Sequence, residues 1–240
     1  VDINKANSNG YTPLYIASQQ GHMDIVKILL DRGADINKAD NGGRTPLWIA
    51  ATNGHVEVVK ILVEREADTD KASEFGYTPL FMASQNGHVE IVRVLVEKGA
   101  DINKADNNRY RILEERGADI NKANNNGTTP LYIASEKGHV EVVRVLVERG
   151  ADINKADDSG WTPLYIASHE GQVEVVKVLA ERGADINKAM NNGATPLYIA
   201  SESGHVEVVK ILAERGADIN RATNTGWTPL LAASQKGHME

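Results

Sequence analysis

The chain of 240 residues contains no cysteine. This absence excludes disulfide bonds, a thiolate nucleophile, and zinc or iron–sulfur sites that use cysteine ligands. Basic residues are in deficit, because 26 Lys and Arg stand against 33 Asp and Glu, for a formal net charge of −7. An acidic chain is a poor general ligand for a phosphate backbone, so we expect no nucleic acid partner.

Long apolar runs are absent as well. No stretch approaches the roughly 20 apolar residues that a membrane-spanning helix needs, and no signal-peptide pattern opens the chain. Hydrophobic residues make up 41% and charged residues 25% of the chain, which favours a folded protein over a disordered one. We therefore expect a soluble, intracellular, cytoplasmic protein with no direct membrane insertion.

What the chain does have is one short motif, Thr-Pro-Leu, repeated along its length. The interval is 33 residues everywhere except between Thr78 and Thr129, where it is 51 residues. A fixed period of this length is typical of proteins built by stacking one supersecondary unit. The motif begins at Thr12, Thr45, Thr78, Thr129, Thr162, Thr195 and Thr228.

Each unit predicts a first short helix, as residues 161–171 illustrate. Thr162 is a good N-cap, and Pro163 suits the first helical position because its missing N–H would have no partner there. Gly171 allows the left-handed turn that ends this helix.

A second helix and a projecting finger follow. Apolar residues at helical spacing predict a helix from Val173, which Gly183 closes. Glu174 and Lys177 stand three residues apart, so they predict a solvent-exposed ion pair on this helix, and equivalent pairs recur in other units. The polar segment 187–193 predicts an extended finger with a tight turn.

This pattern resembles the ankyrin repeat. The 33-residue period, Thr-Pro-Leu-x-x-Ala, Gly-His and the Gly-Ala-Asp-Ile-Asn closure occur together, in register, across nearly the whole chain. The resemblance implies an all-α fold, an ankyrin-repeat solenoid of helix-turn-helix units with β-hairpin fingers. It also implies a non-enzymatic protein–protein interaction scaffold whose fingers and first helices line one concave binding surface.

The chain departs from the family pattern at one recurring position. The residue after Thr-Pro-Leu, where the family most often has His, is aromatic in six units and Leu in the last. A position restricted to rings predicts packing between repeats, so we expect these side chains to be structural. They are Tyr15, Trp48, Phe81, Tyr132, Tyr165 and Tyr198, with Leu231 in the last unit.

The 51-residue interval marks an irregular repeat. We interpret residues 1–240 as a single array of about seven repeats plus one truncated repeat at 101–121, and as an excerpt of a longer chain. At Asn108–Arg109 the sequence is 15 residues short of a full unit. Either the deletion is real and leaves the stump of a second helix, or a first helix is missing from the sequence.

No residue set predicts catalysis, a metal or a cofactor. The Asp, Glu and Ser residues recur as scaffold positions without a unique close pair or triad. Six of the seven His follow the Gly between the helices, and stacked repeats place such positions too far apart to share a zinc ion. His169, on the variable end of a first helix, is the exception and is a candidate binding residue.

Positions that vary between repeats are better candidates for binding. One such position precedes Thr-Pro, and another is the end of the first helix. Tyr and Trp are common at the first, and these residue types are enriched at interface hot spots, although the rings could instead shield the fingers. The predicted binding residues are Tyr11, Arg44, Tyr77, Trp161, His169 and Trp227.

The sequence thus favours a scaffold that binds another protein. One alternative is a structural subunit or linker inside a larger assembly. A second is the repeat region of a larger enzyme or channel, and an engineered consensus array is disfavoured by the irregular interval.

Overall fold

The computed structural model describes residues 2–97 and 117–238. It divides into two compact units, Val1–Asn125 and Asn126–Glu240, here named unit 1 and unit 2. In both units, pairs of short helices alternate with fingers, and the described residues contain helices and turns but no strand. The predicted all-α helix-turn-helix architecture is confirmed.

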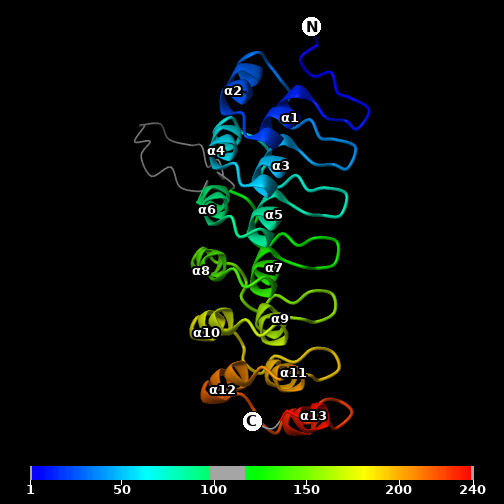
Figure 1. Ribbon diagram of the computed structural model, residues 1–240, viewed down its shortest axis with the longest axis vertical. Helices are drawn as coiled ribbons and strands as arrows, with labels where there is room; N and C mark the ends of the chain where they lie inside the picture. Colours follow the sequence, from blue (N-terminus) through cyan, green and yellow to red (C-terminus); the bar gives the residue numbers. More distant parts are fainter. Residues whose placement is uncertain (1, 98–116, 239–240) are drawn as a thin grey trace, which may run out of the picture. The chain divides into compact units, whose positions relative to one another are not determined.

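Unit 1 contains two parallel stacks of helices (Figure 1). The first helices of the repeats (α1, α3 and α5) form one stack, the second helices form the other, and the fingers project from the first stack on the side away from the second. The helices are α1 (Pro13–Gln20), α2 (Met23–Asp31), α3 (Pro46–Asn53), α4 (Val56–Glu64), α5 (Pro79–Gln85) and α6 (Val89–Glu97).

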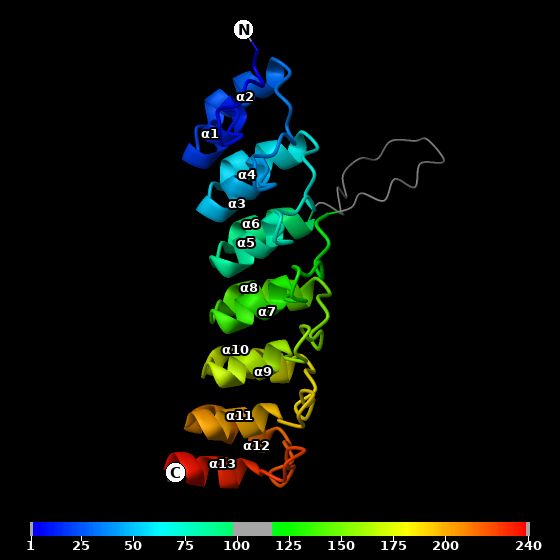
Figure 2. The ribbon, with the colours of Figure 1, turned by 90° about the vertical axis from the view of Figure 1, so that its right-hand side faces the viewer.

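Unit 2 has the same arrangement within itself. Its two helices per repeat overlap when viewed from the side in Figure 2, so each repeat is one layer of the stack. The helices are α7 (Pro130–Glu136), α8 (Val140–Glu148), α9 (Pro163–His169), α10 (Val173–Glu181), α11 (Pro196–Ser203), α12 (Val206–Glu214) and α13 (Pro229–Lys236).

The first helices begin as the sequence predicts. In α9 the backbone N–H of Tyr165 donates to the Thr162 hydroxyl oxygen at 3.1 Å, and Pro163 is the first helical residue. The threonine at the equivalent position caps the first helix in every described repeat. Since an N-cap contributes about 1 kcal/mol, these caps define where each layer starts.

Leucine and branched aliphatic residues fill the space between the two stacks. The Leu of Thr-Pro-Leu and a Leu of the second helix are fully buried in most repeats, as for Leu164 and Leu179 in unit 2. Each such side chain contributes about 2 kcal/mol by removal from water. Burial between layers therefore holds the stack together, as expected for a repeat array.

Histidines at the start of the second helices connect successive layers. His55 Nε2 lies 2.9 Å from the Gln19 carbonyl oxygen of the preceding repeat. A Cβ on Gly21 would lie 2.6 Å from the His55 ring, so glycine at this turn leaves room for the imidazole. Where Gln172 replaces His, its amide nitrogen donates to the Glu136 carbonyl oxygen at 3.0 Å. These side chains therefore bond one layer to the next.

The outer surface of the second helices has the predicted ion pairs. Lys60 contacts Glu57 at 2.9 Å, and Lys177 contacts Glu174 at 2.7 Å. A further type of pair, which the sequence analysis missed, joins successive second helices, as in Arg182–Glu148 at 2.8 Å. It was missed because its partners are 34 residues apart and meet only when layers stack.

The fingers are hairpin-like, but in the described residues they have too few backbone hydrogen bonds to form strands. In the finger before α9, two backbone bonds close the turn: Asp157 N–H donates to the Trp161 carbonyl and Gly160 N–H donates to the Asp157 carbonyl, each at 3.0 Å. Adjacent fingers are joined by one backbone bond, such as Asn41 N–H to the Asn9 carbonyl at 3.2 Å. These bonds do not continue as a ladder, so the backbone stays in turns.

The residues described at the end of the irregular interval, 118–125, make defined contacts with the preceding repeat. The Ala118 backbone N–H donates to the Leu95 carbonyl at the end of α6 at 3.0 Å, and Asp119 N–H donates to the Asp70 carboxylate at 2.8 Å. The finger of residues 118–125 therefore packs on the finger of unit 1 that precedes α5. The Asn108–Arg109 bond and most of the truncated repeat expected at 101–121 lie outside the described residues.

Candidate functional site

The ring that follows Thr-Pro-Leu is packed inside the array. Tyr15, Phe81 and Tyr165 are each 2% exposed or less, and Trp48 and Tyr132 are 7% exposed. The indole N–H of Trp48 also donates to the Tyr77 carbonyl of the next finger at 2.9 Å. The structural role predicted for these rings is confirmed, and only the partly buried Tyr198 and the exposed Leu231 lie nearer the surface.

The residue before Thr-Pro lies on top of this buried row. Tyr11 stacks on Tyr15 with ring centroids 4.7 Å apart and planes parallel within 1°. Tyr77 stacks on Phe81 with ring centroids 4.9 Å apart and planes 29° apart. Since the outer ring and the inner ring are four residues apart, the capped first turn of the helix brings them face to face. The outer rings remain partly exposed.

Arg44 occupies the same position as these outer rings but is held by a buried carboxylate. Its guanidinium contacts the Asp40 carboxylate at 2.6 Å, and the Asp40 side chain is fully buried. The hydrogen bond to Asp40 raises the pKa of Arg44. The guanidinium also lies 5.9 Å from the Trp48 ring and 3.5 Å from the Tyr11 hydroxyl. Arg44 is therefore already paired within its own finger.

In unit 2, the structure brings Trp161 and His169 together. The Trp161 ring centroid lies 5.1 Å from that of Tyr165 and 5.6 Å from that of His169. Trp161 also packs on the cluster that includes the buried Ala194 of the next finger. The ring thus shields the neighbouring finger and still leaves part of its surface exposed.

The remaining predicted residue, Trp227, is partly buried above α13 and has the aliphatic Leu231 at the inner position. Its backbone N–H donates to the Thr223 hydroxyl oxygen at 3.1 Å. Among the predicted residues, Tyr11 and Arg44 therefore meet in unit 1 and Trp161 and His169 meet in unit 2. Tyr77 and Trp227 each stand in a finger of their own.

Carboxylates beside the unit 2 rings were not among the predicted binding residues. Burial raises the pKa of the Tyr132 hydroxyl, and nearby negative charges, including those of Glu136 and Glu170, raise it further. Burial and the negative charge of Glu202 act on Tyr165 in the same direction. The signal that could have found these residues was acidic character at the variable end of the first helices.

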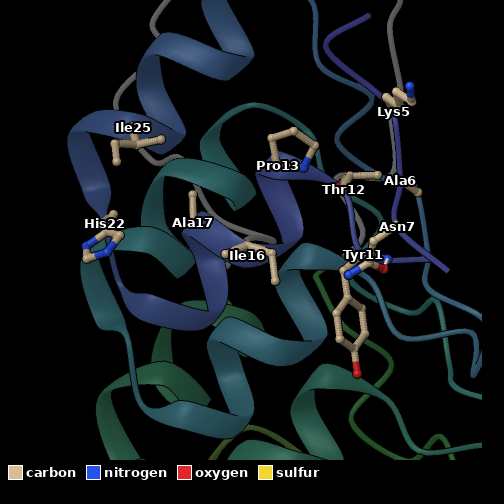
Figure 3. Close-up of a pocket in the computed structure, with 10 residues that line it drawn as sticks. All are labelled: Lys5, Ala6, Asn7, Tyr11, Thr12, Pro13, Ile16, Ala17, His22 and Ile25. Atoms are coloured by element: carbon tan, nitrogen blue, oxygen red, sulfur yellow. Dashed lines mark hydrogen bonds between the residues drawn. The ribbon is translucent and has the colours of Figure 1, made fainter. Parts of the chain in front are cut away.

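An open hollow of about 580 Å³ lies against the first repeat of unit 1 (Figure 3). Its lining side chains come from α1, from α2 with its preceding turn, and from the first finger, and they are mostly apolar. The lining residues are Lys5, Ala6, Asn7, Tyr11, Thr12, Pro13, Ile16, Ala17, His22 and Ile25. They form no acid–base pair or ligand set, so the hollow provides apolar surface and no evident chemistry.

Two further findings bear on the kind of protein. Within residues 2–97 and 117–238, no group of three or more His, Cys, Asp or Glu side chains is arranged to hold a metal ion. None of the helices in these ranges combines the length and the apolar character that crossing a bilayer requires.

Family models match nearly the whole chain. The model described as ankyrin repeats in three copies matches residues 35–106, 107–190 and 187–240, and the single ankyrin repeat model matches residues 9–41. The chain belongs to the ankyrin-repeat family. Ankyrin repeats generally mediate protein–protein interaction and are typically non-enzymatic.

Solved ankyrin-repeat structures agree with this assignment over most of the chain. The ankyrin repeat domain of Bcl-3, titled a unique member of the IkappaB protein family, is 29% identical with a TM-score of 0.80, covering 94% of this chain and 95% of that one. The human ASB11 ankyrin repeat domain is 30% identical with a TM-score of 0.77, covering 93% and 92% respectively. No curated protein matches the chain.

In ankyrin-repeat terms, the candidate residues lie on the fingers and the first helices. We define the finger–helix surface as the residues before Thr-Pro together with the two residues that precede the glycine at the end of each first helix. In unit 1 these helix ends are Gln19, Gln20, Thr52, Asn53, Gln85 and Asn86, and in unit 2 they are Glu136, Lys137, His169, Glu170, Glu202, Ser203, Gln235 and Lys236.

Proposed function

We propose that this ankyrin-repeat chain is an intracellular, non-enzymatic scaffold that binds a partner protein through its finger–helix surface. The observation that carries the proposal is the partly exposed ring before Thr-Pro, which packs against a buried ring in both units, stacked in unit 1 and tilted in unit 2. Such a ring is held in place before any partner arrives, so little side-chain freedom is lost on binding.

Variation at this position supports binding over a purely structural role. Ala194 and Thr128 stand where Trp161 and Tyr77 stand in other repeats, and each of the four residues precedes a well-capped first helix. Because the helix forms with a small residue there, a large ring is not required to build the layer. Partly exposed Trp and Tyr are the residue types that most often dominate interface energies.

The test is affinity capture with the whole chain as bait in a cell extract, followed by quantitative mass spectrometry. The variants Tyr77→Ala and Trp161→Ala remove outer rings of the finger–helix surface. Ile28→Ala removes a side chain that is 53% exposed on the second helix α2, and it is the matched control. Circular dichroism establishes that all three variants are folded.

We expect a defined partner to be depleted by both ring variants and retained by Ile28→Ala. Equal capture by all four proteins, or loss with Ile28→Ala alone, would contradict the proposal, because binding would then use another surface or no specific one.

A further inference from the structure

The two units carry different chemistry at the ends of their first helices. The six residues in unit 1 are amides and one hydroxyl residue, and all are neutral. In unit 2, the ends of three successive first helices carry Glu136, Glu170 and Glu202. A helix end that is neutral in every layer of unit 1 carries a glutamate in three successive layers of unit 2, at one of two adjacent positions, and in the layers of α9 and α11 no lysine stands beside it. This difference suggests recognition of positive charge.

The middle of this acidic row coincides with the aromatic cluster. Trp161, Tyr165 and His169 stand at four-residue spacing, and their rings contact through Trp161 at 5.1 and 5.6 Å. His169 Nδ1 lies 2.7 Å from the Glu170 carboxylate, which fixes that carboxylate beside the rings. Aromatic faces next to carboxylates attract cations through both the ring quadrupole and the full negative charge.

Tyr165 is the inner ring of this cluster. Its side chain is 2% exposed, and burial raises the pKa of its hydroxyl. The partly buried Glu202, whose charge acts on that hydroxyl, has no ion pair with any described Lys or Arg. By contrast, Glu136 is already paired with Lys137 at 2.6 Å.

We propose that Trp161, His169, Glu170 and Glu202, here named the α9–α11 patch, bind an arginine side chain in a basic segment of the partner protein. This inference rests on the proposed function and specifies the partner for the unit 2 part of the surface.

Arginine fits this patch better than lysine does. A guanidinium is planar and weakly hydrated, so it stacks on aromatic rings while its N–H groups donate to carboxylate oxygens. A lysine ammonium is a compact, strongly hydrated charge that has no flat face to stack.

The binding experiment uses the whole chain and three fluorescein-labelled peptides with capped ends. The first alternates arginine with glycine, the second has lysine at every arginine position, and the third has citrulline, a neutral isostere of arginine. Fluorescence polarisation at about 0.1 M salt, where charges more than roughly 10 Å apart are screened, measures each dissociation constant.

We expect the arginine peptide to bind most tightly, the lysine peptide several-fold more weakly, and the citrulline peptide weakest. Trp161→Ala should weaken arginine-peptide binding about tenfold by loss of the cation–π contact. Glu202→Gln, which keeps the side-chain shape, should weaken it about three- to fivefold. The matched control is Glu207→Gln on α12, which makes the same charge change on an exposed second-helix residue and should alter affinity less than twofold.

Two results would overturn the assignment. Equal weakening by Glu202→Gln and Glu207→Gln would mean that the peptide responds only to the overall negative charge. Equal affinity for the arginine and citrulline peptides would mean that charge is not recognised at all.

The outcome also separates this inference from the proposed function. If an extract partner depends on Trp161 while the arginine peptide ignores the patch, the arginine assignment is wrong and the scaffold proposal stands. If the arginine peptide requires the patch while capture from the extract is insensitive to every ring variant, the arginine assignment stands and the scaffold proposal is wrong.

Discussion

Unit 1 and unit 2 are built from the same repeat but differ in the charge at the surface ends of their first helices. In unit 1 the surface ends of the first helices are neutral and the one cation among the outer residues, Arg44, is already paired with Asp40. In unit 2 every helix end carries a Glu or a Lys, and Glu202 lacks a basic partner in the described ranges. The interior is shared, and the surface is where the two units have become different.

Irregularities of the scaffold itself are concentrated in unit 1. Glu66 follows the second helix α4 at a position that is glycine in other repeats, namely Gly33, Gly150, Gly183 and Gly216. Among the described non-glycine residues, it alone has a positive φ, 63°. Asp70 replaces the Asn that receives the next finger in other repeats. Both lie in the finger on which residues 118–125 pack. The difference teaches that repeat sequences tolerate local strain provided that the buried layers are kept.

The largest expected effect tests whether the interiors are equivalent. Phe81→Ala in unit 1 and Tyr165→Ala in unit 2 each remove a ring that is 2% exposed. Each should lower the free energy of unfolding by about 2–4 kcal/mol, because a buried ring leaves a cavity. Urea denaturation followed by circular dichroism measures both. A cost near zero for either ring would show that the two interiors are not equivalent.

The next effect tests the strained closure of α4. Glu66→Gly should stabilise the protein by about 1 kcal/mol, because a side chain with positive φ is strained and glycine is not. The reciprocal change in unit 2, Gly183→Glu, should destabilise by a similar amount; its Cβ would meet nothing within 4 Å, so only the backbone is affected. Thermal unfolding of both variants decides the point, and a loss of stability in Glu66→Gly would rule out strain at this residue.

A pH-dependent effect tests the finger that receives residues 118–125. Burial raises the pKa of the Asp70 carboxyl, so the folded protein favours the protonated form and its stability falls as pH rises above the unfolded pKa, about 4. Asp70→Asn keeps an acceptor for Asp119 N–H without the charge. The variant should gain about 1 kcal/mol at pH 7 and almost nothing near pH 3. Urea titrations at both pH values measure it, and an equal gain at both would exclude the charge as the cause.

The smallest effect compares two hydroxyls at one repeat position. Ser168 in unit 2 donates to the Leu164 carbonyl at 2.7 Å, whereas the buried Ser84 hydroxyl in unit 1 has no partner. Ser168→Ala should cost about 1 kcal/mol, and Ser84→Ala should be neutral or slightly stabilising, as Ala51 at the same position suggests. Matched urea curves compare them; equal costs would mean that the Ser84 hydroxyl finds a partner in solution.

Much of the architecture could be predicted from the repeat unit. Thr162, Pro163 and Gly171 act locally, through a cap, a fixed φ and a left-handed turn. Their roles can therefore be inferred from one short segment of sequence. The burial of Tyr165 was also predictable, because the position accepts only rings in six repeats. The candidate binding residues remain predictions, and their contacts required the folded array.

The contacts of Trp161 show why the rest could not be predicted. Its neighbours include Tyr165 and His169 of its own repeat and Ala194 of the next finger. Whether a ring at this position is shielded or exposed depends on the layer stacked beside it. That layer lies 33 residues along the chain, beyond any local pattern.

By itself, the sequence determined the repeat unit, its two helices, the packed ring and the absence of cysteine chemistry. Two identical segments, residues 99–105 and 117–123, both read Gly-Ala-Asp-Ile-Asn-Lys-Ala, and the sequence alone does not indicate which of them follows the end of α6 in the fold. The tertiary structure decided this when Ala118 N–H bonded to the Leu95 carbonyl and Asp119 bonded to Asp70. Identical segments offer identical local hydrogen bonds, so only long-range contacts, here the docking of one finger on the finger before it, can distinguish them.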